Sequence, residues 1–208
     1  MGAIGVRICT MKKNYILLSI LGTLWGLFET QVGTLLHTAD LPFVGLVMMA
    51  FGIFFQTVAR IITRMRGSAL LMAIVVVFLK LLFVGGIALA TVVAIIIQSM
   101  LLELIYFSPS PSRLRMSFAG AIAVCYSLFH PFLSMPIFMG LTFIDAYARI
   151  VGGGSILLGL PKESGFIIIF ILMMLHMLTG FFASFFSHSV AVKLISLGLL
   201  SPSAIKEQ

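Results

Sequence analysis

Charged side chains are scarce in this chain. Of its 208 residues only 9% are Asp, Glu, Lys or Arg, whereas 61% are hydrophobic, and the mean hydropathy is +1.22. A soluble domain usually carries about 25% charged residues, because its surface has to be hydrated. The shortage of charge therefore excludes a soluble globular protein and predicts an integral membrane protein.

Cysteine is also scarce, and the common metal and nucleotide motifs are missing. Cys9 and Cys125 are too few for a disulfide framework or a four-cysteine metal site. The sequence contains no HExxH zinc motif and no GxxxxGKS/T phosphate-binding loop. We therefore expect no metal, no other cofactor and no nucleotide hydrolysis by the chain itself.

The chain carries a net charge of +7, which could suggest a nucleic-acid partner. A nucleic-acid-binding protein gathers its cations in one polar patch, whereas the cations here lie between hydrophobic runs. Such cations are typical of the loops between membrane helices. We expect membrane lipid, and no nucleic acid, around this protein.

Hydrophobic runs of sufficient length occur along most of the sequence. A helix needs about 20 residues to cross the hydrocarbon layer of a bilayer. We predict an all-α integral membrane protein in which residues 1–208 form a single membrane domain, a six-helix bundle with a long, partly helical outer loop at 135–164. The predicted spans are 14–36, 42–60, 67–85, 87–107, 116–134 and 165–187.

The distribution of Lys and Arg predicts the orientation, because cytoplasmic loops retain positive charge. One side of the predicted bundle holds only Arg149 and Lys162. The other side holds ten basic residues: Arg7, Lys12, Lys13, Arg60, Arg64, Arg66, Arg113, Arg115, Lys193 and Lys206. Both termini are therefore predicted to be cytoplasmic, and the 135–164 loop is predicted to lie outside.

Three ionisable residues, Glu29, Lys80 and Glu103, fall inside the predicted spans. A charge near the centre of a membrane helix costs roughly 2.5 to 3.5 kcal/mol, so each needs a partner or a function. Glu103 lies near the cytoplasmic end, where we expect a structural contact with Arg113, Arg115 or the basic segment 60–66. Glu29 and Lys80 form either an ion pair that fixes helix register or part of a binding site.

Other polar and aromatic side chains fall at similar depths. His130 lies in the same outer layer as Glu29 and Lys80, and Gln98 and His176 lie about midway, as the helical rise of 1.5 Å per residue implies. We predict a polar, partly aromatic cavity that opens outward. The candidate substrate-binding residues are Glu29, Lys80, His130, Trp25, Tyr126, Gln98 and His176.

Small and polar residues recur at helical spacing, which places them on one face of each span. Such stripes are expected to face other helices, because small residues allow close packing in lipid. The stripes are Gly22, Gly26, Glu29 and Gly33; Ala90, Ala94 and Gln98; Gly120, Ala123, Ser127, His130 and Ser134; and His176, Gly180, Ser184 and His188.

The closely spaced Ser19, Gly22 and Gly26 in the first span, with the predicted topology, resemble a substrate-binding S component of an energy-coupling-factor vitamin transporter. The stretch 98–104 also resembles the Gln-Gly-x-x-x-Glu-Leu-like segment of S components for thiamine precursors. The resemblance implies capture of a micronutrient from outside a prokaryotic plasma (inner) membrane. It also implies docking of the first helix on a transmembrane coupling subunit, toppling of the protein in the membrane and release driven by two cytoplasmic ATPases, with no catalysis by this chain.

Other functions remain open. The alternatives are an independent carrier or channel for a small solute, an integral membrane enzyme with an intramembrane histidine, and a structural assembly factor. In the enzyme hypothesis, Ser184 or Ser155 is the nucleophile, and His176 or His130 is the base.

Overall fold

The computed structural model describes residues 3–39, 43–84 and 89–198, and these residues form helices and turns without a strand. Five of the helices are long and apolar enough to cross a membrane. The composition and these helices together identify a membrane-embedded, helical protein, as the sequence predicts.

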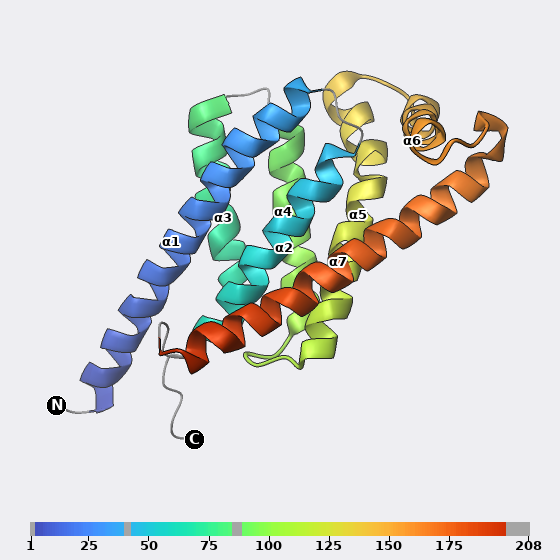
Figure 1. Ribbon diagram of the computed structural model, residues 1–208. Helices are drawn as coiled ribbons and strands as arrows, with labels where there is room; N and C mark the ends of the chain where they lie inside the picture. Colours follow the sequence, from blue (N-terminus) through green and yellow to red (C-terminus); the bar gives the residue numbers. More distant parts are fainter. Residues whose placement is uncertain (1–2, 40–42, 85–88, 199–208) are drawn as a thin grey trace.

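Successive long helices alternate in direction and lie side by side (Figure 1). A shorter helix, α6 (Phe143–Leu158), and a single 3-10 turn, Lys162–Ser164, connect α5 to α7. The long helices are α1 (Ala3–Thr38), α2 (Val44–Thr63), α3 (Ser68–Val84), α4 (Leu89–Tyr106), α5 (Arg113–Met139) and α7 (Gly165–Ser196).

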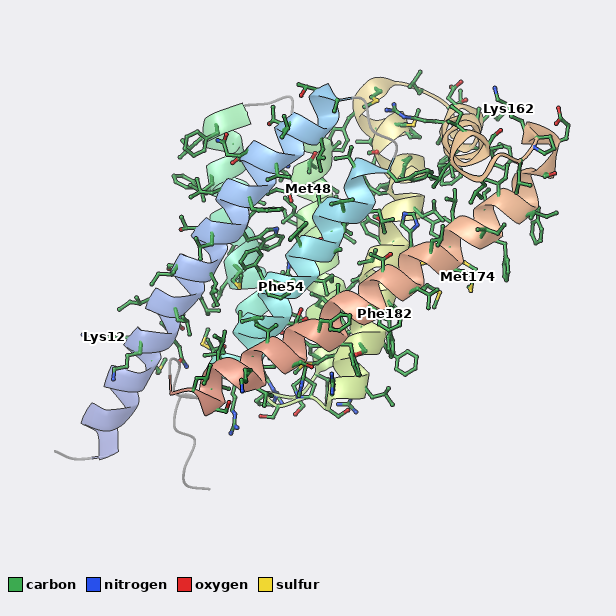
Figure 2. The ribbon with its side chains drawn as sticks, in the orientation of Figure 1. Lys12, Met48, Phe54, Lys162, Met174 and Phe182 are labelled. Carbon is green, nitrogen blue, oxygen red and sulfur yellow. The ribbon has the colours of Figure 1, made fainter. Side chains whose placement is uncertain are left out.

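The two ends of the bundle differ in charge. Where α1 begins and α7 ends, the structure gathers Lys12, Lys13, Arg60, Arg64, Arg66, Arg113, Arg115 and Lys193, and we call this the basic end. Lys12 and Lys162 lie at opposite ends of the molecule (Figure 2). The end that holds Lys162 and α6 is called the opposite end below.

Five of the six predicted spans correspond, with different limits, to helices that are long and apolar enough to cross a membrane. The third predicted span corresponds to α3, whose 17 residues are about 25 Å long and so fall at the lower limit for a membrane helix. Predicted limits at residues 42, 85 and 87 lie outside the described residues.

At their C-terminal ends, α5 and α7 extend furthest beyond the predicted limits. The helix α5 continues past 134 to Met139 although Pro131 and Pro136 lie within it, and α7 continues past 187 to Ser196. Membrane helices tolerate proline because neighbouring groups satisfy the freed carbonyls. Much of the predicted 135–164 loop is therefore helical, in the end of α5 and in α6.

The start of α6 has a capping box. The Thr142 side chain accepts a hydrogen bond from the Asp145 backbone, and the Asp145 carboxylate accepts hydrogen bonds from the Thr142 backbone and hydroxyl. These hydrogen bonds lower the pKa of Asp145, since they favour the charged form. The cap fixes where the chain turns from α5 into α6.

Glycines allow two pairs of helices to approach closely. A Cβ atom on Gly120 of α5 would overlap the backbone of Gly180 of α7, and a Cβ on Gly180 would overlap the backbone of Gly120. On α1, a Cβ on Gly22 would lie 3.1 Å from the Val75 side chain of α3, and a Cβ on Gly26 would lie 2.7 Å from the Leu79 side chain. In lipid the hydrophobic effect does not drive helices together, and close packing of this kind stabilises their association instead.

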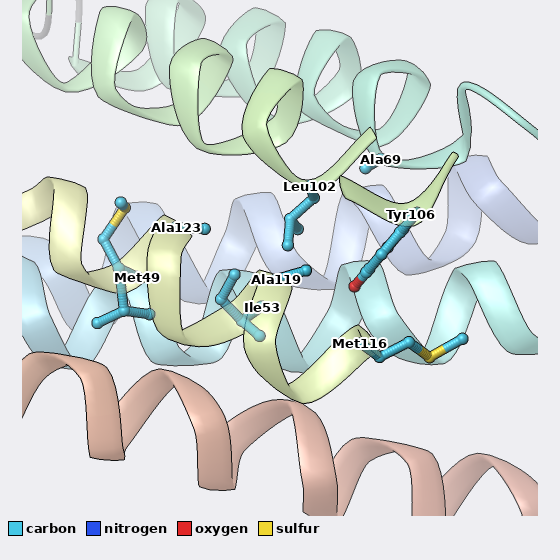
Figure 3. Close-up of a cluster of buried hydrophobic side chains, with 9 residues drawn as sticks. Met49, Ile53, Ala69, Leu102, Tyr106, Met116, Ala119 and Ala123 are labelled. Atoms are coloured by element: carbon cyan, nitrogen blue, oxygen red, sulfur yellow. The ribbon is translucent and has the colours of Figure 1, made fainter. Parts of the chain in front are cut away.

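The core between the helices combines aliphatic side chains with one buried tyrosine (Figure 3). Tyr106 of α4 belongs to one buried cluster with Ile53 of α2 and Ala119 of α5, and its hydroxyl lies 2.9 Å from the Thr57 hydroxyl. Large apolar side chains such as Phe182 are exposed on the outside of the bundle, where lipid would cover them (Figure 2).

Candidate functional site

The buried charges of α1 and α3 form an ion pair. Lys80 Nζ of α3 donates a 2.8 Å hydrogen bond to Glu29 Oε1 of α1, and these residues are only 8% and 4% exposed. The pairing satisfies both charges away from water, as the first of the two alternatives for these residues expects. Helical spacing places Glu29 on the same buried face as Gly22 and Gly26, which brings α1 against α3.

Glu29 also lines a cavity between α1, α2, α4 and α5, here called the central cavity. Its volume is about 190 Å³. The polar part of the wall consists of Glu29, Thr91, Gln98, Ser127, His130 and Ser134. The remaining wall is made of small or aliphatic residues: Gly45, Met48, Met49, Ala90, Ala94 and Ile95.

A second cavity of about 560 Å³ lies between α2, α5, α6 and α7, here called the peripheral cavity. Exposed Arg149 and Ile156 of α6 border it, so it reaches the protein surface towards the opposite end. Four residues line both cavities: Gly45, Ser127, His130 and Ser134. The two cavities are thus neighbours across a wall made of α2 and α5.

His130 is the central side chain of this shared wall. Its Nδ1 lies 2.8 Å from the Tyr126 hydroxyl one helical turn earlier. The Ala90 backbone is near the ring, but Nε2 is buried and has no hydrogen bond of normal geometry with any described residue. His130 therefore has one nitrogen fixed by Tyr126 and another that a bound molecule could use.

Gln98 and His176 are held by backbone groups. Gln98 Nε2 donates to the Met49 carbonyl at 3.2 Å, which ties α4 to α2 beside the central cavity. His176 Nδ1 lies 2.7 Å from the Leu172 carbonyl, so this nitrogen carries the proton and donates. The ring of His176 lines the peripheral cavity.

Two of the predicted aromatic contacts lie behind the cavity walls. Trp25 is 1% exposed and packs in the core with Met72 and Val76, and it lines neither described cavity. Tyr126 contacts His130 instead of lining a cavity. A position along a helix does not by itself define which neighbouring helix a side chain meets.

The small-residue stripe predicted for partner docking is occupied within the chain. Gly22 and Gly26 are covered by α3, and only Ser19 of the predicted trio is exposed. The exposed side of α1 instead presents large apolar residues, including Ile16, Ile20 and Leu24. The resemblance in spacing thus reflects packing between α1 and α3 in this structure.

Glu103 has the structural role that the sequence predicts. Its carboxylate accepts hydrogen bonds from Arg60 and from the Gly67 and Ala69 backbone amides at the start of α3. Arg60 also donates to the Met65 carbonyl. Of the expected partners, the basic segment 60–66 provides the contact, so Glu103 joins α4 to the turn between α2 and α3.

The side chains named in the enzyme hypothesis make other contacts. The Ser155 hydroxyl donates to the Leu160 carbonyl at 2.6 Å, and the Ser184 hydroxyl lies 3.3 Å from the Thr57 hydroxyl. His130 and His176 bond to Tyr126 and Leu172, as described above. No serine–histidine hydrogen bond forms among these four described side chains.

Several lining residues are absent from the sequence-based candidates. Met48, Met49 and Ile95 have no polar group to distinguish them from other core residues, and Arg149 lies in the region predicted as a loop. Ser127, Ser134 and Ala94 share helical stripes with His130 and Gln98, and this spacing predicts their inward position.

The fold and cavities define a membrane-embedded helical protein with an interior polar site. Comparison with known proteins finds no matching family model, no matching curated protein and no matching solved structure. The arrangement of the site is therefore the basis for a functional proposal.

Proposed function

We propose that this protein captures a small, water-soluble micronutrient with high affinity, as the substrate-specific subunit of an ATP-driven energy-coupling-factor transporter. The observation that supports the proposal most directly is the pair of adjoining cavities, which brings Glu29, Gln98, His130 and His176 from four helices to one interior region. The resemblance stated above adds the transporter class.

In this proposal the protein is a six-span bundle in the plasma membrane of a prokaryote, with α3 as the shortest span. The basic end faces the cytoplasm, together with both termini, because positively charged loops are retained there. The peripheral cavity then opens outward, beside α6. A solute from outside would enter there and reach the central cavity past His130.

The cavities suit recognition of a small molecule. Pockets for small ligands usually measure about 300–1,000 Å³ and combine apolar walls with a few polar groups. The peripheral cavity, at about 560 Å³, lies within this range, and the adjoining central cavity, at about 190 Å³, is smaller. Met48, Met49 and Ile95 offer apolar contact, while Glu29 and His130 offer hydrogen-bonding atoms. A hydrogen bond to a charged group is strong in a site from which water is excluded, which supports high affinity.

The proposed partners are a transmembrane coupling subunit and two cytoplasmic ATPases. Because α3 covers Gly22 and Gly26, docking of α1 would use its exposed apolar side, with Ile16, Ile20 and Leu24. The chain itself would perform no reaction. Its role would be to bind the solute and to move as a unit when the coupling subunit moves.

An independent carrier or channel is the second candidate, because buried polar side chains continue towards the basic end. Tyr106 and Ser184 bond to Thr57, and Arg60 and Glu103 follow closer to the basic end. Gln56 is buried nearby on α2, and neither of its amide atoms has a hydrogen-bond partner among the described residues. Such a series of polar groups could accompany a solute through the bilayer.

A two-stage experiment separates these functions. Native mass spectrometry of the protein purified from cells grown in rich medium would first identify a retained small molecule. The same compound, isotopically labelled, is then tested in liposomes. We expect binding without accumulation by the chain alone, and ATP-dependent accumulation when a coupling subunit and its ATPases are present. Accumulation by the chain alone would instead establish an independent carrier.

A further inference from the structure

A third cavity lies at the basic end of the bundle, far along the helices from the proposed substrate site. It is a groove of about 330 Å³ between α3, the end of α4 and the α2–α3 turn. Its apolar wall consists of Leu70, Met100, Leu104 and Phe107. Leu104 and Phe107 are 70% and 76% exposed, so the groove opens sideways on the surface that faces lipid.

Two of the three charged residues that line the groove form an ion pair with each other. Arg60 is buried and forms an ion pair with Glu103, whose carboxylate also accepts hydrogen bonds from the Gly67 and Ala69 amides at the start of α3. This pairing neutralises both charges and fills the N-terminus of α3. Neither Arg60 nor the helix terminus therefore remains as an anion site.

Arg66 carries the uncompensated charge. It is exposed, its guanidinium carbon lies 5.8 Å from the centre of the Phe107 ring, and it forms no ion pair or hydrogen bond with another described residue. Phe107 has a left-handed backbone (φ 46°), which is uncommon for a bulky side chain. The ring contact holds the Arg66 cation at the mouth of an apolar groove.

We propose that this groove binds an anionic phospholipid, with the headgroup phosphate on Arg66 and one acyl chain along Met100, Leu104 and Leu70. The position fits, because the basic ends of the helices are where headgroups meet the protein. The chemistry fits as well, since guanidinium groups bind phosphate oxygens strongly and basic pockets between membrane helices take anionic headgroups. This proposal does not depend on the proposed transport function.

The test compares lipids with identical acyl chains. Purified protein in a neutral detergent is titrated with phosphatidylglycerol or phosphatidylcholine, and the lipids retained per protein are counted by native mass spectrometry. We expect the first phosphatidylglycerol to bind at least about fivefold more tightly, which is the effect of roughly one basic residue at a membrane surface. Equal affinity for the two lipids would overturn the proposal.

Two matched variants locate the site. Arg66→Gln removes the proposed phosphate contact, and Arg115→Gln removes the same charge from an exposed residue at the same end but outside the groove. The preference for phosphatidylglycerol should disappear in Arg66→Gln and persist in Arg115→Gln. An equal loss in both variants would show general charge attraction and would contradict a defined groove. Arg66 and Arg115 are both exposed, so both variants should elute as folded protein in size-exclusion chromatography.

A third measurement distinguishes a lipid from a free phosphate ester. Glycerol 3-phosphate has the same phosphate chemistry without acyl chains, so it should displace phosphatidylglycerol poorly. Efficient displacement by glycerol 3-phosphate would mean that the groove takes a soluble phosphate ester, and the lipid proposal would then be wrong.

Discussion

Glu29 and Lys80 form a pair that joins two helices, and one of the two residues also faces a cavity. Their 2.8 Å contact joins α1 to α3, while Glu29 also lines the central cavity. A buried ion pair contributes little net stability compared with an apolar pair of similar size, because both charges lose their hydration. Removal of one partner is strongly destabilising, since it leaves the other charge buried without compensation.

Single and double substitutions separate the two roles. Glu29→Gln or Lys80→Met alone should lower the free energy of unfolding by about 3–5 kcal/mol, because each leaves one uncompensated buried charge. The double variant should recover most of this loss. The free energies can be measured by unfolding in mixed micelles.

Ligand retention in the same double variant tests the binding role. If Glu29 contacts the ligand, the double variant folds but no longer retains the compound that the unaltered protein binds. A double variant that is stable and binds normally would show that the pair only fixes helix register.

At the scale of helices, the crossing of α5 and α7 is fixed by backbone contact. Gly120 and Gly180 face each other at a distance that leaves no room for a methyl group on either residue. The crossing brings His176 of α7 to the same cavity as His130 of α5. Close packing in one place therefore determines the geometry of the site in another.

Gly180→Ala should destabilise the protein by roughly 1–3 kcal/mol, as overpacking of a tight contact usually does. The new methyl group would meet the backbone of Gly120, which cannot rotate away as a side chain can. Gly152→Ala in α6 is the matched control, because a Cβ there meets nothing within 4 Å. Thermal unfolding in detergent measures both. Equal stability of the two variants would contradict the role of the crossing.

The sequence predicts where the helices lie along the chain better than it predicts which helices contact each other. Hydrophobic length identifies the long helices, and helical spacing correctly places Ser127, His130 and Ser134 on one inward face. The same spacing cannot tell whether the partner of Gly22 and Gly26 is α3 or another subunit. For the same reason Trp25 was expected in the cavity, whereas it packs behind it with Met72.

The end of α5 illustrates a second limit. The fifth predicted span ends at residue 134, but α5 continues to Met139 with Pro131 and Pro136 inside it, because neighbouring groups can compensate in a helix bundle. The peripheral cavity depends on this extension, since Met135 and Met139 line it. Residues such as Arg149 could not be assigned to the site before the position of α6 was known.

Over the whole molecule, the separation of charge between the two ends is the property that sets the proposed direction of capture. The basic end gathers most of the described Lys and Arg residues, whereas the opposite end carries Arg149 and Lys162. The peripheral cavity reaches the surface near α6. Binding from outside requires that the α6 end be the external one.

Cysteine labelling in intact cells tests this orientation. In a chain with Cys9 and Cys125 replaced by serine, Lys162→Cys should react with a membrane-impermeant maleimide. Lys12→Cys should react only after the cells are permeabilised. Both positions are exposed and lie at opposite ends of the bundle (Figure 2). The reverse pattern would place the peripheral cavity on the cytoplasmic side.

The central claim is that the adjoining cavities hold a small molecule, and a cavity-filling substitution tests it most directly. Gly45 lines both cavities, and a Cβ at this position meets nothing within 4 Å, so Gly45→Leu should fill the space without disturbing the fold. Gly152→Leu adds the same side chain at an open position that lines neither cavity. Native mass spectrometry of both variants, purified in parallel from rich medium, measures the retained molecule. The account predicts occupancy in Gly152→Leu and loss in Gly45→Leu, whereas equal occupancy in the two folded variants would contradict it.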